Sequence, residues 1–189
     1  MFNYLNIQFF KKERRILLNM LEFSKKLWYN IFGKVYKREK EEDKNMINVL
    51  SLSNHIISLF EKNGTKITNL KLQKILYYTQ GYFLKQFGKE AFIEDIYSWQ
   101  YGPVVPTVYY QYNYCGSCPL TSEVDLFLQI EEKEKELIEK IVDKCMYIPS
   151  SKLVNMTHSE LPWKNTDIGC IISKQSIKMF FNFSNPLEI

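Results

Sequence analysis

Two neighbouring stretches with helical spacing of apolar residues constrain this chain more than any other feature. Between residues 46 and 62 the apolar side chains recur every three or four positions, which places them on one face of a helix. They are Val49, Leu52, Ile56, Leu59 and Phe60. We expect Asn63-Gly64 to end this helix, because both residue types tolerate a left-handed backbone.

A second, longer helix is predicted directly after it. The hydroxyl of Thr68 can cap the amide of Lys71, and the helix runs to about Gln86, with Gly88 as its stop. Its predicted inward face consists of Leu72, Ile75, Leu76, Thr79, Tyr82 and Phe83.

The segment after Gly88 is less regular. Residues 91–99 can form either a helical turn or an extended stretch, and Gly102-Pro103 then predicts a turn. Pro106 fits the first turn of a short helix over residues 106–112, where a missing amide does no harm. Residues 114–119 are typical of a loop.

The remaining predicted helices are amphipathic. Residues 130–145 are highly charged but carry a narrow apolar stripe, which indicates a helix docked by one side. Ser150 or Ser151 can cap a helix to about Met156, and Ser173 can cap another. The sequence therefore predicts a mainly α fold, a single compact domain of about six helices over residues 46–189 with a Gly-Pro turn segment.

Residues 1–45 differ from this domain in charge. They hold 11 Lys and Arg against 6 Asp and Glu, a net charge of +5, whereas residues 46–189 hold 14 against 15, a net charge of −1. Within residues 16–35 a broad apolar face is opposed by basic residues, which predicts an amphipathic helical extension. Such a helix can lie on an anionic membrane or pair with a partner, and membrane contact is conceivable only here.

The extension has another interpretation. Glu41-Glu42-Asp43 can be encoded by a purine-rich stretch that resembles a bacterial ribosome-binding site, at a suitable distance before Met46. Met46 is then the native start, and residues 1–45 are no part of the working protein. The intact mass of the natively expressed protein distinguishes the two.

Charge and hydropathy exclude several classes of protein. The nearly neutral domain has no basic stripe for a phosphate backbone, so nucleic acid is not an expected partner. No apolar run is long enough for a membrane span, and the N-terminus lacks the order of a secretory signal, which together predict a cytoplasmic protein. In that compartment we expect the four cysteines to be thiols.

Motifs for catalysis or cofactors are missing. There is no glycine-rich phosphate loop, nucleophile elbow or His-Glu-x-x-His sequence. Cys115 and Cys118 form one Cys-x-x-Cys pair, but a structural zinc site normally has a second close pair. His158-Ser-Glu160 is not followed by the Pro-Cys-x-x-Cys of zinc deaminases. We therefore expect no enzyme, no metal and no cofactor.

Three aromatic and polar motifs stand out instead. They are Ile67-Thr-Asn-Leu-Lys-Leu-Gln-Lys-Ile-Leu-Tyr-Tyr-Thr-Gln-Gly-Tyr82, Trp99-Gln-Tyr-Gly-Pro-Val-Val-Pro-Thr-Val-Tyr109 and Leu153-Val-Asn-Met-Thr-His-Ser-Glu-Leu-Pro-Trp163. In this order and spacing they resemble the Panacea domain, an antitoxin family that includes SocA-like and phage-associated proteins. The resemblance covers residues 46–182 and implies a compact, largely helical domain.

The resemblance also implies a function. Panacea-like proteins neutralise diverse protein toxins encoded by a neighbouring gene through direct contact. One branch resembles a proteolytic adaptor that delivers its toxin to a Clp-type protease, and the sequence leaves open which mode applies. A prophage-derived metal enzyme that uses His158, Glu160 and the cysteines is the third alternative.

Partner contacts are expected from polar and aromatic residues of the three motifs. Gln73, Lys74 and Gln80 fall off the apolar stripe, and the rings of Trp99 and Tyr109 either pack internally or form a surface anchor. We expect Trp163 to cover His158 inside the fold, or the Thr157-His158 segment to form a polar partner site. The full candidate set is Gln73, Lys74, Gln80, Trp99, Tyr101, Gly102, Pro103, Val105, Pro106, Tyr109, Thr157, His158, Pro162 and Trp163.

Overall fold

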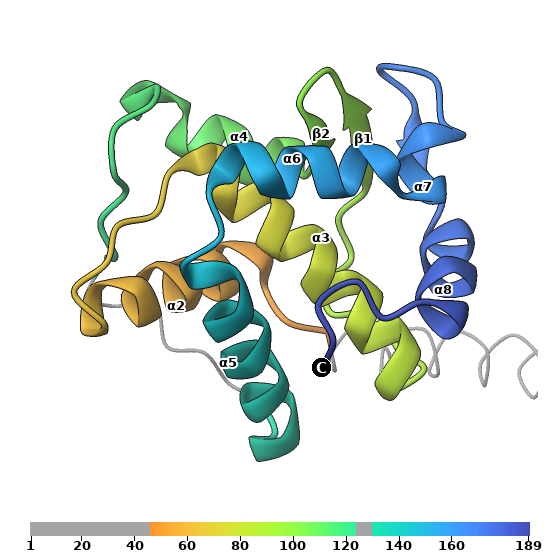
Figure 1. The fold of residues 1–189 in the computed structure, drawn as a ribbon. Helices are drawn as coiled ribbons and strands as arrows, with labels where there is room; N and C mark the ends of the chain where they lie inside the picture. Colours follow the sequence, from red (N-terminus) through yellow and green to blue (C-terminus); the bar gives the residue numbers. More distant parts are fainter. Residues whose placement is uncertain (1–45, 124–129) are drawn as a thin grey trace, which may run out of the picture. The chain divides into compact units, whose positions relative to one another are not determined.

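The structure, a computed structural model, describes residues 46–123 and 130–189, except the side chain of Cys115. These residues belong to one compact unit that begins at Met46. Helix α3 (Asn69–Gln86) runs through its middle, and the other elements pack around it (Figure 1). The expected amphipathic helix within residues 1–45 lies outside the described residues, and the division of the chain at residue 46 stays a prediction.

Helices α2 (Val49–Lys62) and α3 form where the apolar spacing predicts them. Asn63 follows α2 as its C-cap, and Gly64 adopts a left-handed backbone with φ of 64°. Thr68 caps α3 by accepting a hydrogen bond from the Lys71 amide, 3.4 Å from its hydroxyl. Both predicted apolar faces lie in the core, apart from the half-buried Leu59.

A small antiparallel sheet follows α3. Strand β1 (Ile96–Trp99) lies between β2 (Gly102–Val104) and β3 (Ile171–Ile172). Gly102-Pro103, expected to form the turn, are the first residues of β2 instead, so the turn of the β1–β2 hairpin is made by Gln100 and Tyr101. The reason is pairing: Trp99 and Gly102 lie opposite each other in the register, which leaves two residues for the connection.

The chain after the hairpin is helical again. It forms α4 (Pro106–Tyr112), the 3-10 turn η1 (Asn113–Cys115), α5 (Glu132–Met146) and α6 (Ser150–Ser159). Pro106 starts α4, and the stripe of α5 is buried, both as predicted. The expected serine cap of α6 is wrong, because Pro149 occupies the N-cap position and only its backbone carbonyl is used there.

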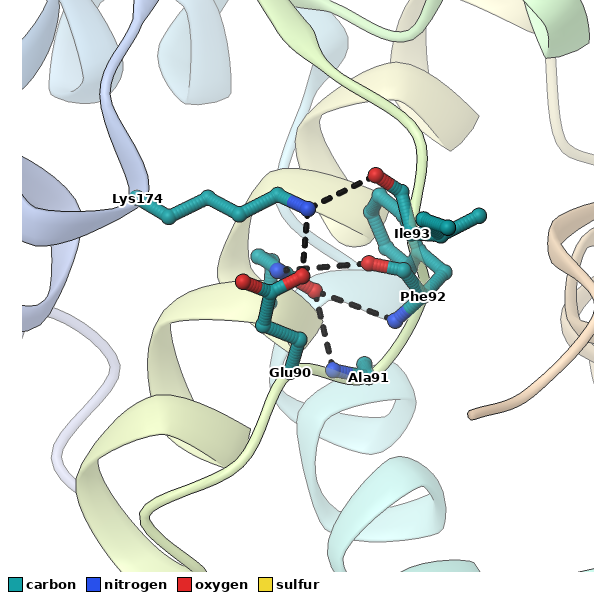
Figure 2. A network of polar contacts seen from close by, with 6 residues as sticks. Glu90, Ala91, Phe92, Ile93 and Lys174 are labelled. Atoms are coloured by element: carbon teal, nitrogen blue, oxygen red, sulfur yellow. Dashed lines mark hydrogen bonds and ion pairs between the residues drawn. The ribbon is translucent and has the colours of Figure 1, made fainter. Parts of the chain in front are cut away.

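The chain ends with α7 (Leu161–Lys164), β3 and α8 (Lys174–Phe183), the last capped by Ser173 as predicted. Lys174, at the start of α8, pairs with Glu90 and donates to the carbonyl oxygen of Ile93 at 2.7 Å (Figure 2). The loop before β1 is thereby fixed to α8. The described residues are mainly helical, which confirms the expected fold class.

The expectation that the four cysteines are thiols is met only in part. Cys145 is a buried thiol and Cys170 an exposed one, but Cys118 is in a disulfide. The prediction that all cysteines are thiols is therefore wrong for Cys118. Local loop geometry, and not the cellular compartment alone, decides whether two sulfur atoms can meet.

Candidate partner-binding site

Three polar side chains of α3 that sequence reasoning offered for partner contact are fully buried. Gln73, Lys74 and Gln80 have relative exposures of 1%, 0% and 0%. The amide oxygen of Gln80 accepts hydrogen bonds from the backbone of Ala91 at 3.0 Å and of Phe92 at 3.3 Å. All three side chains thus bind the protein's own backbone, and burial leaves them no surface for a partner.

Gln73 and Lys74 both reach strand β2 and the residue after it. The amide oxygen of Gln73 accepts a hydrogen bond from the Val105 amide at 2.8 Å, and its own amide group donates to Asn69. The Nζ atom of Lys74 donates to the carbonyl oxygen of Pro103 at 2.8 Å. Burial lowers the pKa of Lys74 to about 7, since the charged form is poorly solvated there.

Gly102 makes the close approach of Lys74 possible. A Cβ atom on Gly102 would lie 2.8 Å from Nζ of Lys74 and 2.8 Å from the hydroxyl oxygen of Thr157. Its φ of +98° is also a conformation that favours glycine. Thr157 is fully buried, and its hydroxyl donates a hydrogen bond to the carbonyl oxygen of Val154. Thr157 therefore packs against the hairpin and is not part of the surface.

His158 and Trp163 support the same hairpin. Their rings stack with centroids 3.8 Å apart and planes at 15°, as expected if Trp163 covers His158. The indole Nε1 of Trp163 donates to the carbonyl oxygen of Trp99 at 3.0 Å. Burial, and next the nearby charge of Lys74, lower the pKa of His158, while a hydrogen bond with the Gln100 backbone opposes this. Both rings are half-buried.

An aromatic cluster joins this supported hairpin to α4. Trp99 contacts Tyr109 edge to face at a centroid distance of 4.9 Å, and Tyr110 contacts both rings. Tyr110 and Tyr101, at the turn, are each 62% exposed. We call Trp99, Tyr101, Tyr109 and Tyr110 the aromatic hairpin surface. Of these, sequence reasoning left Tyr110 out of the candidate set, although its position beside Tyr109 pointed to it.

The remaining candidates are structural neighbours of this surface. Pro103, Val105 and Pro162 are buried, and Pro106 is half-buried at the start of α4. The carbonyl oxygen of Tyr109 accepts a hydrogen bond from Asn69 at 3.0 Å, which ties α4 to α3. The candidate residues thus divide into a few rings that reach solvent and a larger group that holds them.

Sequence reasoning considers Glu160 only for a metal enzyme and does not predict its buried pairing with two tyrosines. Glu160, at the end of α6, accepts hydrogen bonds from the hydroxyls of Tyr77 at 2.8 Å and Tyr78 at 2.9 Å. Burial raises the pKa of Glu160 to about 7, although both hydrogen bonds act in the other direction. The consecutive tyrosines, one turn after Lys74, were the only signal in the sequence.

No three His, Cys, Asp or Glu side chains of the described residues lie close enough together to hold a metal ion. Likewise, none of the helices in residues 46–123 and 130–189 is long and apolar enough to cross a membrane. What this region offers is a supported aromatic surface, and that suits binding to another macromolecule.

Comparison with known proteins places the three motifs in one family. Residues 72–164, which include α3 from Leu72, the hairpin and α6, match the family described as "Antitoxin SocA-like, Panacea domain". Residues 72–164 therefore match the Panacea family. The chain is also similar to a protein named Antitoxin SocA from Caulobacter vibrioides (strain NA1000 / CB15N). The two are 25% identical over 162 residues, which cover 75% of this chain and 86% of the relative.

No solved structure matches the chain. The Panacea match confirms the resemblance predicted from the three motifs. It spans the buried polar side chains of α3, the aromatic hairpin surface and the His158–Trp163 stack, so all of these belong to the matched domain.

Proposed function

We propose that this protein is the antitoxin of a bacterial or prophage toxin–antitoxin pair, and that it neutralises a protein toxin encoded by a neighbouring gene through direct binding. The observation that carries the proposal is the similarity to Antitoxin SocA, which extends over 86% of that protein and includes the Panacea domain. Binding needs no chemical step, so no residue is assigned a catalytic role. The protein acts in the cytoplasm, where its toxin is made.

The aromatic hairpin surface is the proposed contact for the toxin. Tyrosine and tryptophan contribute large apolar area and a polar tip at little conformational cost, which is why they dominate binding hot spots. Here the rings are already ordered, because Trp99 and Tyr109 support each other and Trp163 holds the Trp99 backbone. A preformed surface loses less entropy on binding than a flexible one.

The burial of most candidate side chains reduces the number of residues that can contact the toxin directly. Trp99, Tyr101, Tyr109 and Tyr110 remain as direct contacts, with the half-buried His158 and Trp163 at the edge. The buried candidates, among them Gln73, Lys74 and Gln80, act through the hairpin and loop that they hold.

Residues 46–189 are the proposed working unit. The charge difference at residue 45 and the compact unit from Met46 support this division. A fragment of residues 46–189 should protect cells as well as the full chain does. Loss of protection in the fragment would instead assign residues 1–45 a part in toxin binding.

Coexpression tests the function directly. The product of each adjacent gene is induced alone, with this protein, and with a Y101A/Y110A variant, in strains with and without Clp-type proteases. We expect one product to stop growth alone and to be tolerated with the wild-type protein in both strains. If protection disappears without the protease, the protein is an adaptor for degradation. If no adjacent product is both toxic and neutralised, the antitoxin assignment fails.

A further inference from the structure

Two adjacent side chains of α3 take the place of a further strand beside β2. Ser98 of β1 uses both its backbone groups on the β3 side, because its amide donates to Cys170 and its carbonyl oxygen accepts from Gly169. Alternation along an antiparallel ladder therefore turns the backbone of its partner, Pro103, away from β1. Proline fits this outward position, since no ladder amide is needed there.

The outward groups of β2 and its next residue are then satisfied by α3. Lys74 donates to the Pro103 carbonyl oxygen and Gln73 accepts from the Val105 amide, each at 2.8 Å. Figure 1 shows the hairpin above α3, and strand β2 is in contact with this helix. A donor and an acceptor thus alternate along this edge as the groups of a neighbouring strand would.

Burial of the Lys74 amino group costs more free energy than filling the same space with an apolar side chain would. Its side chain is fully buried, and none of the ion pairs among the described residues includes it. A buried amino group without a counter-charge is unfavourable, whereas methionine would fill similar volume without that penalty. Packing alone therefore does not account for an amino group at this position.

We propose that Lys74 is the positioning residue of the toxin-binding surface: its amino group fixes β2 to α3 and thereby holds Tyr101 and Trp99 in the arrangement that the toxin recognises. The inference rests on the proposed function for the identity of the partner. Its structural part, the attachment of the hairpin, concerns the free protein alone.

Lys71 provides a matched control on the same helix. Its Nζ atom donates to a backbone carbonyl oxygen as well, that of Met146 at 2.6 Å, and its side chain is also buried. Met146 ends α5, however, so this bond fixes another element. Lys71→Met removes the same chemical interaction and should leave the hairpin in place.

The test compares the full-length wild type, Lys74→Met and Lys71→Met. Amide hydrogen exchange by NMR is measured for Tyr97, Trp99, Gly102 and Val104 in the free protein, with α3 core amides as internal reference. Affinity is measured against the adjacent gene product that coexpression identifies. We expect Lys74→Met to speed hairpin exchange at least tenfold and to weaken binding at least tenfold, and Lys71→Met to change each less than threefold.

Three results would overturn the proposal. Unchanged hairpin exchange in Lys74→Met would show that Lys74 does not attach the hairpin to α3. Faster exchange with unchanged affinity would show that Lys74 does not position the toxin-binding surface, while the antitoxin function stands. Equal effects of both variants reduce Lys74 to a general stabilising residue. Absence of any toxin partner instead overturns the proposed function and leaves the exchange result interpretable. If Lys74→Met does not fold, Lys74→Gln and Lys71→Gln carry the same readouts and criteria.

Discussion

The carboxylate of Glu160 accepts a hydrogen bond from the hydroxyl of Tyr78, 2.9 Å from Oε1, in the buried contact between α6 and α3. Tyr77 donates to the other carboxylate oxygen. The two rings also contact Phe181 of α8 edge to face. The carboxylate thus joins α6 to α3, in a position where its ionised form is poorly solvated, and its two tyrosine partners pack against α8.

The buried Glu160 should make stability depend on pH. Its pKa is raised from 4.5 to about 7 in the folded protein, so the folded state binds more protons than the unfolded chain between these values. This contribution is complete below pH 4.5 and is lost as the pH rises through 7. The wild type should therefore lose about 3 kcal/mol from this group between pH 4.5 and pH 8. Urea unfolding of wild type and Glu160→Gln at both pH values measures it. An equal change in both proteins would contradict the assignment.

Lys74 should act in a separate window and with the opposite sign. Its pKa falls from 10.5 to about 7 on folding, so between these values the unfolded chain binds more protons and stability rises with pH. The limiting slope is on the order of 1.4 kcal/mol per pH unit. We expect the stability difference between wild type and Lys74→Met to change by this slope from pH 7.5 to pH 9.5 in urea titrations. A constant difference would show that Lys74 keeps an ordinary pKa.

Gly102→Ala should damage the hairpin support. The new Cβ atom meets Nζ of Lys74 and the hydroxyl of Thr157 at 2.8 Å, and the residue keeps a positive φ. Strain and overpacking together predict a loss of about 3 kcal/mol. Gly64→Ala is the control, because its φ is +64° but nothing lies within 4 Å of its Cβ, so it should lose only about 1 kcal/mol. Similar losses in denaturant unfolding would mean that the space at Gly102 is not tight.

Trp163→Phe tests the bond below the hairpin turn. Phenylalanine can retain the stack on His158 but lacks the Nε1 donor to the Trp99 carbonyl oxygen. Loss of one such hydrogen bond predicts about 1 kcal/mol lower stability, together with faster amide exchange at the turn than in α5. Unchanged exchange at the turn would show that this bond does not order the hairpin.

Local patterns in the sequence were enough to predict the longer helices, but not the short α7. Thr68, Asn63-Gly64 and Ser173 mark helix ends through short-range chemistry, and the apolar spacing of α2, α3 and α5 identifies their buried faces. The three motifs were also enough for the family, since their order and spacing survive without any knowledge of contacts.

The polar face of α3 could not be predicted in the same way. Gln73, Lys74 and Gln80 are buried because backbone groups from residues 91–105 come to them, and helical periodicity contains no information on those distant segments. The assignment of Gly102-Pro103 to a turn failed for a related reason. Only the register with β1 reveals that the backbone of Pro103 faces away from β1. The missing amide of proline is harmless there, because no hydrogen bond to β1 is needed. The pairing of Glu160 with Tyr77 and Tyr78 was not predicted, because these partners are about 80 residues away in the sequence.

Direct binding of the toxin through the aromatic hairpin surface is best tested by calorimetric titration of the purified toxin with three forms of this protein. Tyr101 and Tyr110 are exposed on the surface, whereas Tyr147, 78% exposed at the end of α5, serves as the matched control. The wild type and Tyr147→Ala should bind with equal affinity, and Tyr101→Ala/Tyr110→Ala should bind at least a hundredfold more weakly, or about 3 kcal/mol. Equal affinity of all three forms would contradict the account.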